Sequence, residues 1–188
     1  MSGPLPAAVR LAAAAPILRC LMHDRLGALG TGAVLLARTA VPGRAVAATF
    51  RVDLRCLGVT DAAVRELGLG ALRSLIAELG AARPMVPAAP AQARKLVRAA
   101  AAYGASLGFA APAGLAGADA LFGAVDADAW PEPIVCGSDG LPLYAPDPDT
   151  PPERVRAVAA QLRRRLGPDG FRLALPASAH QFGQDGSP

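Results

Sequence analysis

Arg51, Asp53 and Arg55 alternate along one predicted strand face, and they are the residues of this sequence best suited to chemistry. They lie in Ala45–Val59, where apolar and polar residues alternate with the period of a strand that buries one face. A carboxylate between two guanidinium groups should stay ionised, which suits ligand or metal binding better than general acid catalysis. The competing hypothesis, which we favour, is a surface ion-pair row of little energetic value. The opposite face should pack in the core and carries Val46, Ala48, Phe50, Val52, Leu54 and Cys56.

Histidine and cysteine are too few and too scattered for most catalytic or zinc-binding constellations. The chain has two histidines, His23 and His180, and no nucleophile-elbow sequence around a serine. A structural zinc ion usually takes four cysteine or histidine ligands, whereas Cys20, Cys56 and Cys136 lie far apart without CxxC spacing. We therefore interpret the cysteines as buried, reduced thiols.

An acidic stretch later in the chain offers a second place for a ligand. Asp126 and Asp128, with Glu132 or Asp139, could hold a hard cation, although their spacing is not that of an EF-hand. Aspartates in proline-rich loops more often cap turns. No glycine-rich phosphate-binding motif is present, because Gly68–Gly70 lies within a helical pattern. We predict no metal site and no cofactor.

The net charge of +4 conceals a segregation of charge along the chain. Residues 1–98 carry thirteen Arg or Lys and five Asp or Glu, residues 99–153 carry eight acids and no Arg or Lys, and residues 154–188 carry six Arg and two Asp. One interpretation is a basic surface that binds nucleic acid or another polyanion. We favour the other, in which the acidic block folds against the basic flanks or meets a neighbouring subunit, because no recognised nucleic-acid-binding module is present.

The densest basic run is Arg163, Arg164 and Arg165, in the last turn of a predicted helix. Positive charge at that end complements the helix dipole without any ligand, and no interleaved aromatic residues are available to stack on bases. We interpret the run as a solvated face. Together with the row at residues 51–55, it nevertheless forms the surface on which we would place a partner.

Hydrophobic spacing and turn residues predict an α+β fold in a single domain, residues 1–175, followed by a disordered tail at residues 176–188. Antiparallel hairpins at about 31–59 and 133–145 should pack against four or five helices. Residues 81–91 contain three prolines and should form a flexible, extended connector. The helices are expected at 7–29 (started or interrupted at Pro16), from Thr60 or Asp61 to Leu79 (with a possible break at the glycines), at 92–107, at 115–122 and at 152–166 behind a capping box.

Nothing in the sequence indicates a membrane protein. No apolar run reaches the ~18–20 residues that cross a bilayer. The N-terminal apolar stretch is interrupted by Arg10 and Pro16, which is unlike a signal peptide. We therefore expect a cytoplasmic protein without membrane contact.

Two segments, read together, point to a family. Phe50–Val59 (FRVDLRCLGV) and Ala93–Phe109 (ARKLVRAAAAYGASLGF) resemble an uncharacterised bacterial protein family that pairs a VDLxCLGV strand with a downstream ARKLV…Y…SLGF helix. Thr60 stands where relatives carry a lysine. The resemblance spans most of the chain from Gly30 to Leu175 and implies a shared fold. The family has no known activity, so the resemblance transfers no function.

These features predict a non-catalytic binding or accessory module of a larger complex, which contacts nucleic acid or an anionic partner through its basic face. A protein partner or an oligomer is expected. The alternative is a hydrolase-like enzyme that uses Asp53 with a metal ion or His23. Convergence of Asp53, His23 and one loop carboxylate in a concave pocket would favour the enzyme, whereas an arginine row on an open convex surface would favour the binding module.

Overall fold

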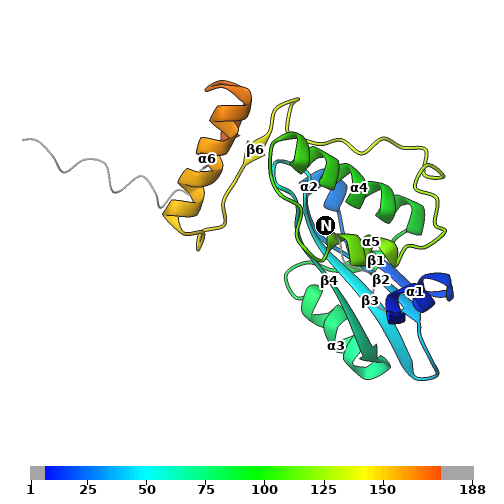
Figure 1. Ribbon diagram of the computed structural model, residues 1–188. Coiled ribbons are helices and arrows are strands. Elements are labelled where there is room, and N and C mark those ends of the chain that lie inside the picture. The colour runs from blue at the N-terminus through cyan, green and yellow to red at the C-terminus, as the bar shows by residue number, and fades with distance from the viewer. Residues whose placement is uncertain (1–6, 175–188) are drawn as a thin grey trace, which may run out of the picture.

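A five-stranded antiparallel sheet with helices on both faces forms the main body of the protein (Figure 1). The computed structural model describes residues 7–174, so the predicted tail and His180 lie outside the described residues. The strand order is β4-β3-β2-β1-β5. The α+β fold predicted from the sequence is therefore confirmed. The strands are β1 (Ile17–His23), β2 (Thr31–Thr39), β3 (Arg44–Asp53), β4 (Gly58–Gly68) and β5 (Met85–Pro87).

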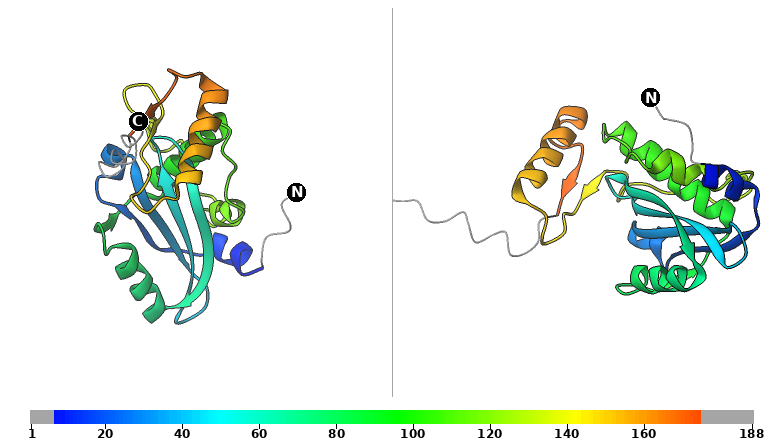
Figure 2. Two further views of the ribbon diagram at one scale, coloured as in Figure 1. Left: turned by 90° about the vertical axis from the view of Figure 1, so that its left-hand side faces the viewer. Right: turned by 60° about the horizontal axis from the view of Figure 1, so that its bottom comes forward.

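The helices cover the two faces of the sheet unequally, as the rotated views in Figure 2 show. Helix α3 (Leu69–Leu79) packs alone on one face, where Leu72 and Leu75 meet Leu35 and the alanines of β3. The other face holds the larger core, centred on the buried Phe50 and Phe122. Three helices cover that core: α1 (Ala7–Ala14), α4 (Pro90–Ser106) and α5 (Leu115–Ala120). A single turn, α2 (Leu26–Leu29), links β1 to β2.

A small C-terminal unit stands beside this body and consists of β6 (Leu143–Tyr144), α6 (Pro152–Leu166) and β7 (Arg172–Leu173). Its two short strands pair in parallel. A third core cluster, built from the buried Cys56, Leu107, Tyr144 and Leu162, joins the unit to the sheet and to α4. Among residues 7–174, no helix combines the length and the apolar character that crossing a bilayer requires.

The first hairpin agrees closely with the sequence prediction. Thr31–Thr39 is a strand with the predicted bounds, and it pairs antiparallel with β3 from Thr31 opposite Asp53 to Thr39 opposite Ala45. The six residues predicted for the core face, from Val46 to Cys56, are all buried. The prediction was incomplete on the other face, because Ala45 and Ala47 are buried beneath α3.

Two segments predicted as helix are strands. Ile17–His23 is β1, between β2 and β5, because its residues Cys20–Met22 are buried within the sheet and a short, mostly apolar segment of this kind has no distinctive period. Gly58–Gly68 is β4, and the helix predicted from Thr60 or Asp61 begins only at Leu69. The break that the glycines suggested therefore marks the change from strand to helix.

The later part of the chain departs from the prediction in three places. The predicted hairpin at 133–145 is reduced to one antiparallel bridge, Ser138 opposite Leu141, and β6 pairs with β7 instead. The capping box before α6 is not formed, since Pro151 caps the helix without a side-chain hydrogen bond. Part of the proline-rich connector is the edge strand β5, which pairs with β1.

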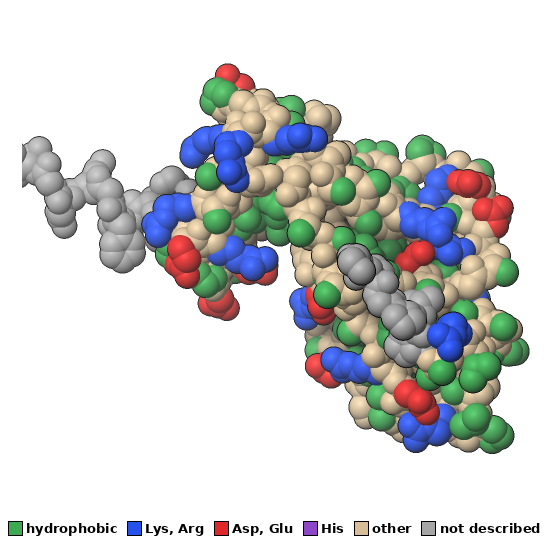
Figure 3. All heavy atoms as spheres, viewed as in Figure 1, with side chains coloured by type: hydrophobic (Ala, Val, Ile, Leu, Met, Phe, Trp, Pro, Cys, Tyr) green, Lys and Arg blue, Asp and Glu red, His purple; other side chains and the backbone are tan. Residues whose placement is uncertain are grey.

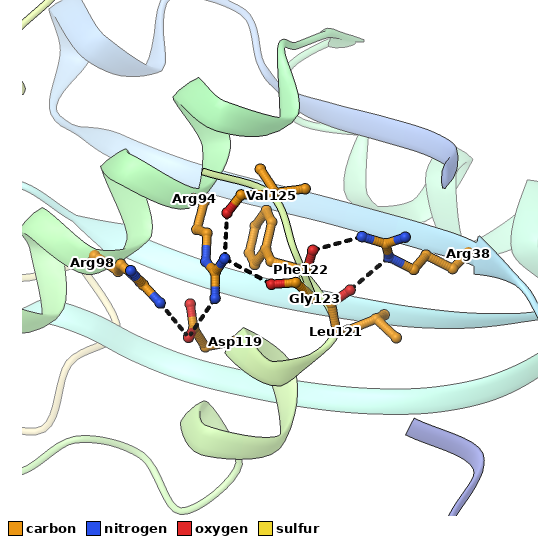
Figure 4. Close-up of polar contacts among 8 residues, drawn as sticks. All are labelled: Arg38, Arg94, Arg98, Asp119, Leu121, Phe122, Gly123 and Val125. Carbon is orange, nitrogen blue, oxygen red and sulfur yellow. Dashed lines mark hydrogen bonds and ion pairs between the residues drawn. The ribbon is translucent and has the colours of Figure 1, made fainter. Parts of the chain in front are cut away.

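Two arginines hold the segment after α5 against the sheet (Figure 4). Arg38, only 6% exposed on β2, donates from Nε to the carbonyl of Leu121 at 2.7 Å and from Nη2 to that of Phe122 at 2.6 Å. Burial, and then the nearby Arg94, lower the pKa of Arg38 below its ordinary value. Arg94 donates to the carbonyls of Gly123 and Val125. These guanidinium groups donate to main-chain carbonyls of the segment, and that of Phe122 also accepts the N–H of Val125 at 3.2 Å.

The sheet and α4 meet at a point where two glycines touch. Gly58, at the start of β4, has φ +78°, and a Cβ there would lie 2.6 Å from the Ala100 carbonyl oxygen. A Cβ on Gly104 of α4 would lie 2.7 Å from the Leu57 carbonyl oxygen. The two segments that carry the family resemblance are therefore packed backbone to backbone at this contact.

We expect Gly104→Ala to lower the free energy of unfolding by about 1–3 kcal/mol, because the added methyl forces Leu57 away from the helix. The matched control is Gly117→Ala in α5, where a Cβ meets nothing within 4 Å. That change should leave stability unaltered or raise it by up to ~1 kcal/mol through helix propensity. Urea denaturation compares the two, and equal stability of the variants would contradict the close contact.

Candidate functional site

The turn between β3 and β4 is organised by the carboxylate of Asp53. Its Oδ1 accepts the main-chain N–H groups of Arg55 at 2.9 Å and Cys56 at 3.1 Å, and its Oδ2 accepts that of Leu57 at 3.3 Å. The chain leaves the strand at Asp53, because these N–H groups point at the carboxylate and not at a neighbouring strand. The predicted strand through Val59 is therefore interrupted by a turn.

Asp53 consequently shapes the turn. The ion-pair row that we favoured is present in part: Asp53 pairs with Arg55 Nε at 4.0 Å, but its side chain is only 14% exposed, so this pair does not lie on the surface. Burial raises the pKa of Asp53 above its ordinary value, while the three N–H donors and Arg55 act in the opposite direction. The turn also directs the side chain of Cys56 into the core, whereas that of Arg55 stays half-buried.

A cavity of about 730 Å³ opens beside this turn, between the sheet and the C-terminal unit. Figure 3 shows the molecule hollowed between the two parts, with basic side chains on both sides of the hollow. Its size is in the range of ordinary ligand sites. The ends of β1, β2 and β3, the loop after α3 and the segment leading into α6 all contribute to its lining.

Four arginines from separate segments line this cavity: Arg51, Arg55, Arg83 and Arg154. Arg83 donates to the carbonyl of Thr31 at 2.8 Å. Arg55 Nε is buried with no hydrogen-bond partner, although its side chain is 30% exposed as a whole. Within residues 7–174, the guanidinium groups of Arg51 and Arg154 have no carboxylate or carbonyl acceptor.

Gly30 makes room for one of these side chains. A Cβ at Gly30, which has φ +74°, would lie 2.5 Å from Cγ of Arg55. The aliphatic part of Arg55 therefore rests on the bare backbone of Gly30, which caps α2, and Arg55 is one of the residues that line the cavity. No local pattern in the sequence indicates this contact, because it depends on the turn at Asp53.

His23 lines the same cavity, but both of its ring nitrogens are engaged. Nδ1 accepts the N–H of Ala33 at 3.1 Å, which requires the proton to lie on Nε2. Nε2 then donates to the carbonyl of Leu79 at 2.8 Å. The ring is thus held as a neutral tautomer that joins β1, β2 and the end of α3, and neither nitrogen is free to accept a proton from a substrate.

The carboxylates around the cavity are Asp53, Glu78 and Asp147. Asp53, His23 and a loop carboxylate thus converge in a concave site, the arrangement that we set as favourable to an enzyme. Their hydrogen bonds do not suit catalysis, since Asp53 accepts N–H groups of the turn and His23 bonds to main-chain groups of β2 and α3. In the described part of the chain, no three His, Cys, Asp or Glu residues form a group able to hold a metal ion.

The predicted binding residues fall into two separate places. Arg51, Asp53 and Arg55 line the cavity, whereas Arg163–Arg165 lie at the opposite end of α6. There Arg164 donates to Gln161 and Arg165 donates to the Ser106 carbonyl at 3.0 Å. Arg83 and Arg154 were not predicted as binding residues, because no local pattern in the sequence reveals that their segments line the same cavity as β3.

The cysteines are free, as predicted for reduced thiols, with Cys20 and Cys56 buried and Cys136 half-buried. Burial raises the pKa of Cys20 to about 11, and burial followed by the charge of Asp53 raises that of Cys56 to about 12. Both therefore remain protonated near neutral pH, where a thiol is a poor nucleophile. Cys56 packs in the cluster that joins the C-terminal unit to the sheet.

The acidic block meets the basic flanks only in part. Asp119 pairs with Arg94 at 3.7 Å and with Arg98 at 3.4 Å, and Asp139 pairs with Arg172 at 2.8 Å. Figure 4 shows the two arginines of α4 approaching Asp119 from the same side. No ion pair among residues 7–174 involves the other six acids of the block.

Comparison of the chain with protein-family profiles, with curated proteins and with solved structures returned no match. The geometry of the cavity and its arginines therefore carries the functional argument, and the resemblance stated above stays a prediction.

We expect Asp53→Ala to lower the free energy of unfolding by about 2–4 kcal/mol, because it leaves three buried N–H donors without an acceptor. The matched control is Asp61→Ala, an exposed residue opposite Arg51 on β4, which should change stability by less than ~0.5 kcal/mol. Chemical denaturation measures both. A cost below ~1 kcal/mol at Asp53 would restore the surface ion-pair interpretation.

Proposed function

We propose that this protein is a non-catalytic binding module, an accessory subunit of a cytoplasmic complex, whose arginine-lined cavity takes an anionic group of its partner. The partner is a protein or a nucleic acid. The proposal rests on one observation: four arginines from four segments line a single cavity, and within residues 7–174 the guanidinium groups of two of them, Arg51 and Arg154, have no carboxylate or carbonyl acceptor.

The electrostatics of the cavity favour an anion. Bringing four guanidinium groups to one concave site costs free energy through their mutual repulsion, and an anion removes that cost. Guanidinium groups also bind carboxylates and phosphates through paired, parallel hydrogen bonds. Asp53, Glu78 and Asp147 also line the cavity and offset part of this charge, so that the arginines exceed the carboxylates by one.

The contact between the two resemblance segments supports a shared fold for the family that the chain resembles. Gly58 and Gly104 can approach only because neither has a side chain. This close contact would therefore require both the VDLxCLGV segment and the Y…SLGF helix. This argument supports a common architecture and carries no information on a reaction.

The hydrolase-like alternative has weaker support. Asp53, His23 and Asp147 line the same cavity, but a general base needs a free lone pair within reach of the substrate. The ring nitrogens of His23 are both used, and the oxygens of Asp53 accept three N–H groups. Asp53 and His23 would have to react, but their hydrogen bonds stabilise the turn and the sheet.

The proposal is tested by anion binding to a pair of variants on one helix. Arg154 lines the cavity, and Arg156, two residues along α6, is exposed and outside it. We expect poly-glutamate or mixed DNA and RNA oligonucleotides to bind, with an affinity that falls as salt rises. Arg154→Glu should weaken binding at least tenfold, whereas Arg156→Glu should change it less than twofold. Fluorescence anisotropy across a salt series measures both effects.

Two outcomes would contradict the proposal. One is the absence of binding to every polyanion at low salt. The other is equal weakening by Arg154→Glu and Arg156→Glu, which would indicate a diffuse interaction with the surface of α6 and not with the cavity. Thermal unfolding of each variant verifies that the charge reversals leave the fold intact.

A further inference from the structure

We propose that the cavity accepts the acidic loop at residues 124–135 of a second copy of this chain, so that copies associate head to tail. This inference rests on the proposed function, because it names the anionic partner of the arginine cavity. It accounts for three of the six acids of the 99–153 block that form no ion pair within residues 7–174.

The loop displays free carboxylates. Asp126, Asp128 and Glu132 are exposed, and none of them forms an ion pair within residues 7–174. The only hydrogen bond that these three carboxylates accept in this part of the chain is the one from the Asp128 N–H to Asp126 Oδ1, at 3.0 Å. Val135, at the end of the loop, is 75% exposed and would gain from coverage.

The basic residues beside the loop are already engaged with its main chain. Arg94 donates to the carbonyls of Gly123 and Val125, and Lys95 Nζ donates to that of Trp130 at 2.7 Å. These bonds fix the path of the loop while leaving its carboxylates without charged partners. A preformed loop loses little conformational entropy on binding, which favours association.

A loop in this position cannot fill the cavity of its own chain. In Figures 1 and 2 the loop runs past α4 and α5 on the side of the main body away from the C-terminal unit, and the cavity lies next to that unit. The donor and acceptor surfaces are therefore different patches of one molecule. Contacts of this kind are heterologous and generate rings or open chains.

Charge and size are complementary. The loop carries three carboxylates, the arginines of the cavity outnumber its own carboxylates by four to three, and a loop tip can enter a hollow of about 730 Å³. The single tryptophan of the sequence, Trp130, lies half-buried in the loop and reports on its surroundings. Association should therefore change the emission of that one residue.

The test uses the full chain in analytical ultracentrifugation across a range of concentrations, at low salt and in 0.5 M salt. We expect the mean mass to rise with concentration at low salt and to fall toward the monomer at high salt. A cavity variant, Arg51→Glu with Arg154→Glu, and a loop variant, Asp126→Lys with Asp128→Lys, should each weaken self-association at least tenfold. Arg156→Glu should behave as wild type.

Mixing the two variants separates head-to-tail contact from other forms of association. The loop variant keeps an intact cavity, and the cavity variant keeps an intact loop. An equimolar mixture should associate, with a change in Trp130 emission that neither variant shows alone.

The inference is overturned if the wild type stays monomeric at every concentration, or if the loop variant self-associates as strongly as wild type. Retention of poly-glutamate or oligonucleotide binding by such a monomeric protein would leave the proposed function standing, with a partner other than a second copy. Loss of all anion binding together with loss of self-association would reject both.

Discussion

The carboxylate of Asp53 is the interaction on which the rest of the site depends. By accepting three successive N–H groups, it ends β3 and bends the chain back into β4. The bend directs Cys56 into the cluster beneath the C-terminal unit and Arg55 toward the cavity. It also presents Gly58 to α4, where only glycine permits the approach. One turn thus sets the position of the sheet, the helix and the C-terminal unit relative to each other.

The cavity is a consequence of that arrangement. The C-terminal unit docks on the turn through Tyr144 and Leu162, and the hydrogen bond from Leu143 N–H to the Arg55 carbonyl, at 2.9 Å, ties the two main chains together. The hollow that remains between unit and sheet is lined by arginines from β3, the turn after it, the loop after α3 and α6. Asp53, Glu78 and Asp147 line it as well and offset part of that positive charge, which leaves the arginines in excess by one. This excess supports the proposed binding of an anionic group.

Much of the architecture could be predicted, and the misses have identifiable physical causes. Thr31–Thr39 is a short, mostly apolar run bounded by turn residues, and Pro90–Ser106 has a helical period, so their class was predictable from the sequence. Ile17–His23 was mistaken for helix because burial in the sheet, which no local pattern reveals, decides its structure. Arg51, Asp53 and Arg55 were predicted to lie close together, and all three line the cavity. The role of Asp53 was not predictable, because the apolar–polar alternation continues through the residues that form the turn. Arg83 and Arg154 come from segments far apart in the chain, and only the tertiary fold brings them to the same cavity.

The most direct test of this account is a titration of isotope-labelled protein with poly-glutamate, followed through the Nε–Hε resonances of the arginine side chains. The account predicts that the signals of the four cavity arginines, Arg51, Arg55, Arg83 and Arg154, shift together and saturate at one concentration of ligand. Those of Arg73 and Arg156, which are exposed outside the cavity, should stay in place. Shifts centred on Arg163–Arg165, or spread evenly over all exposed arginines, would contradict the central claim.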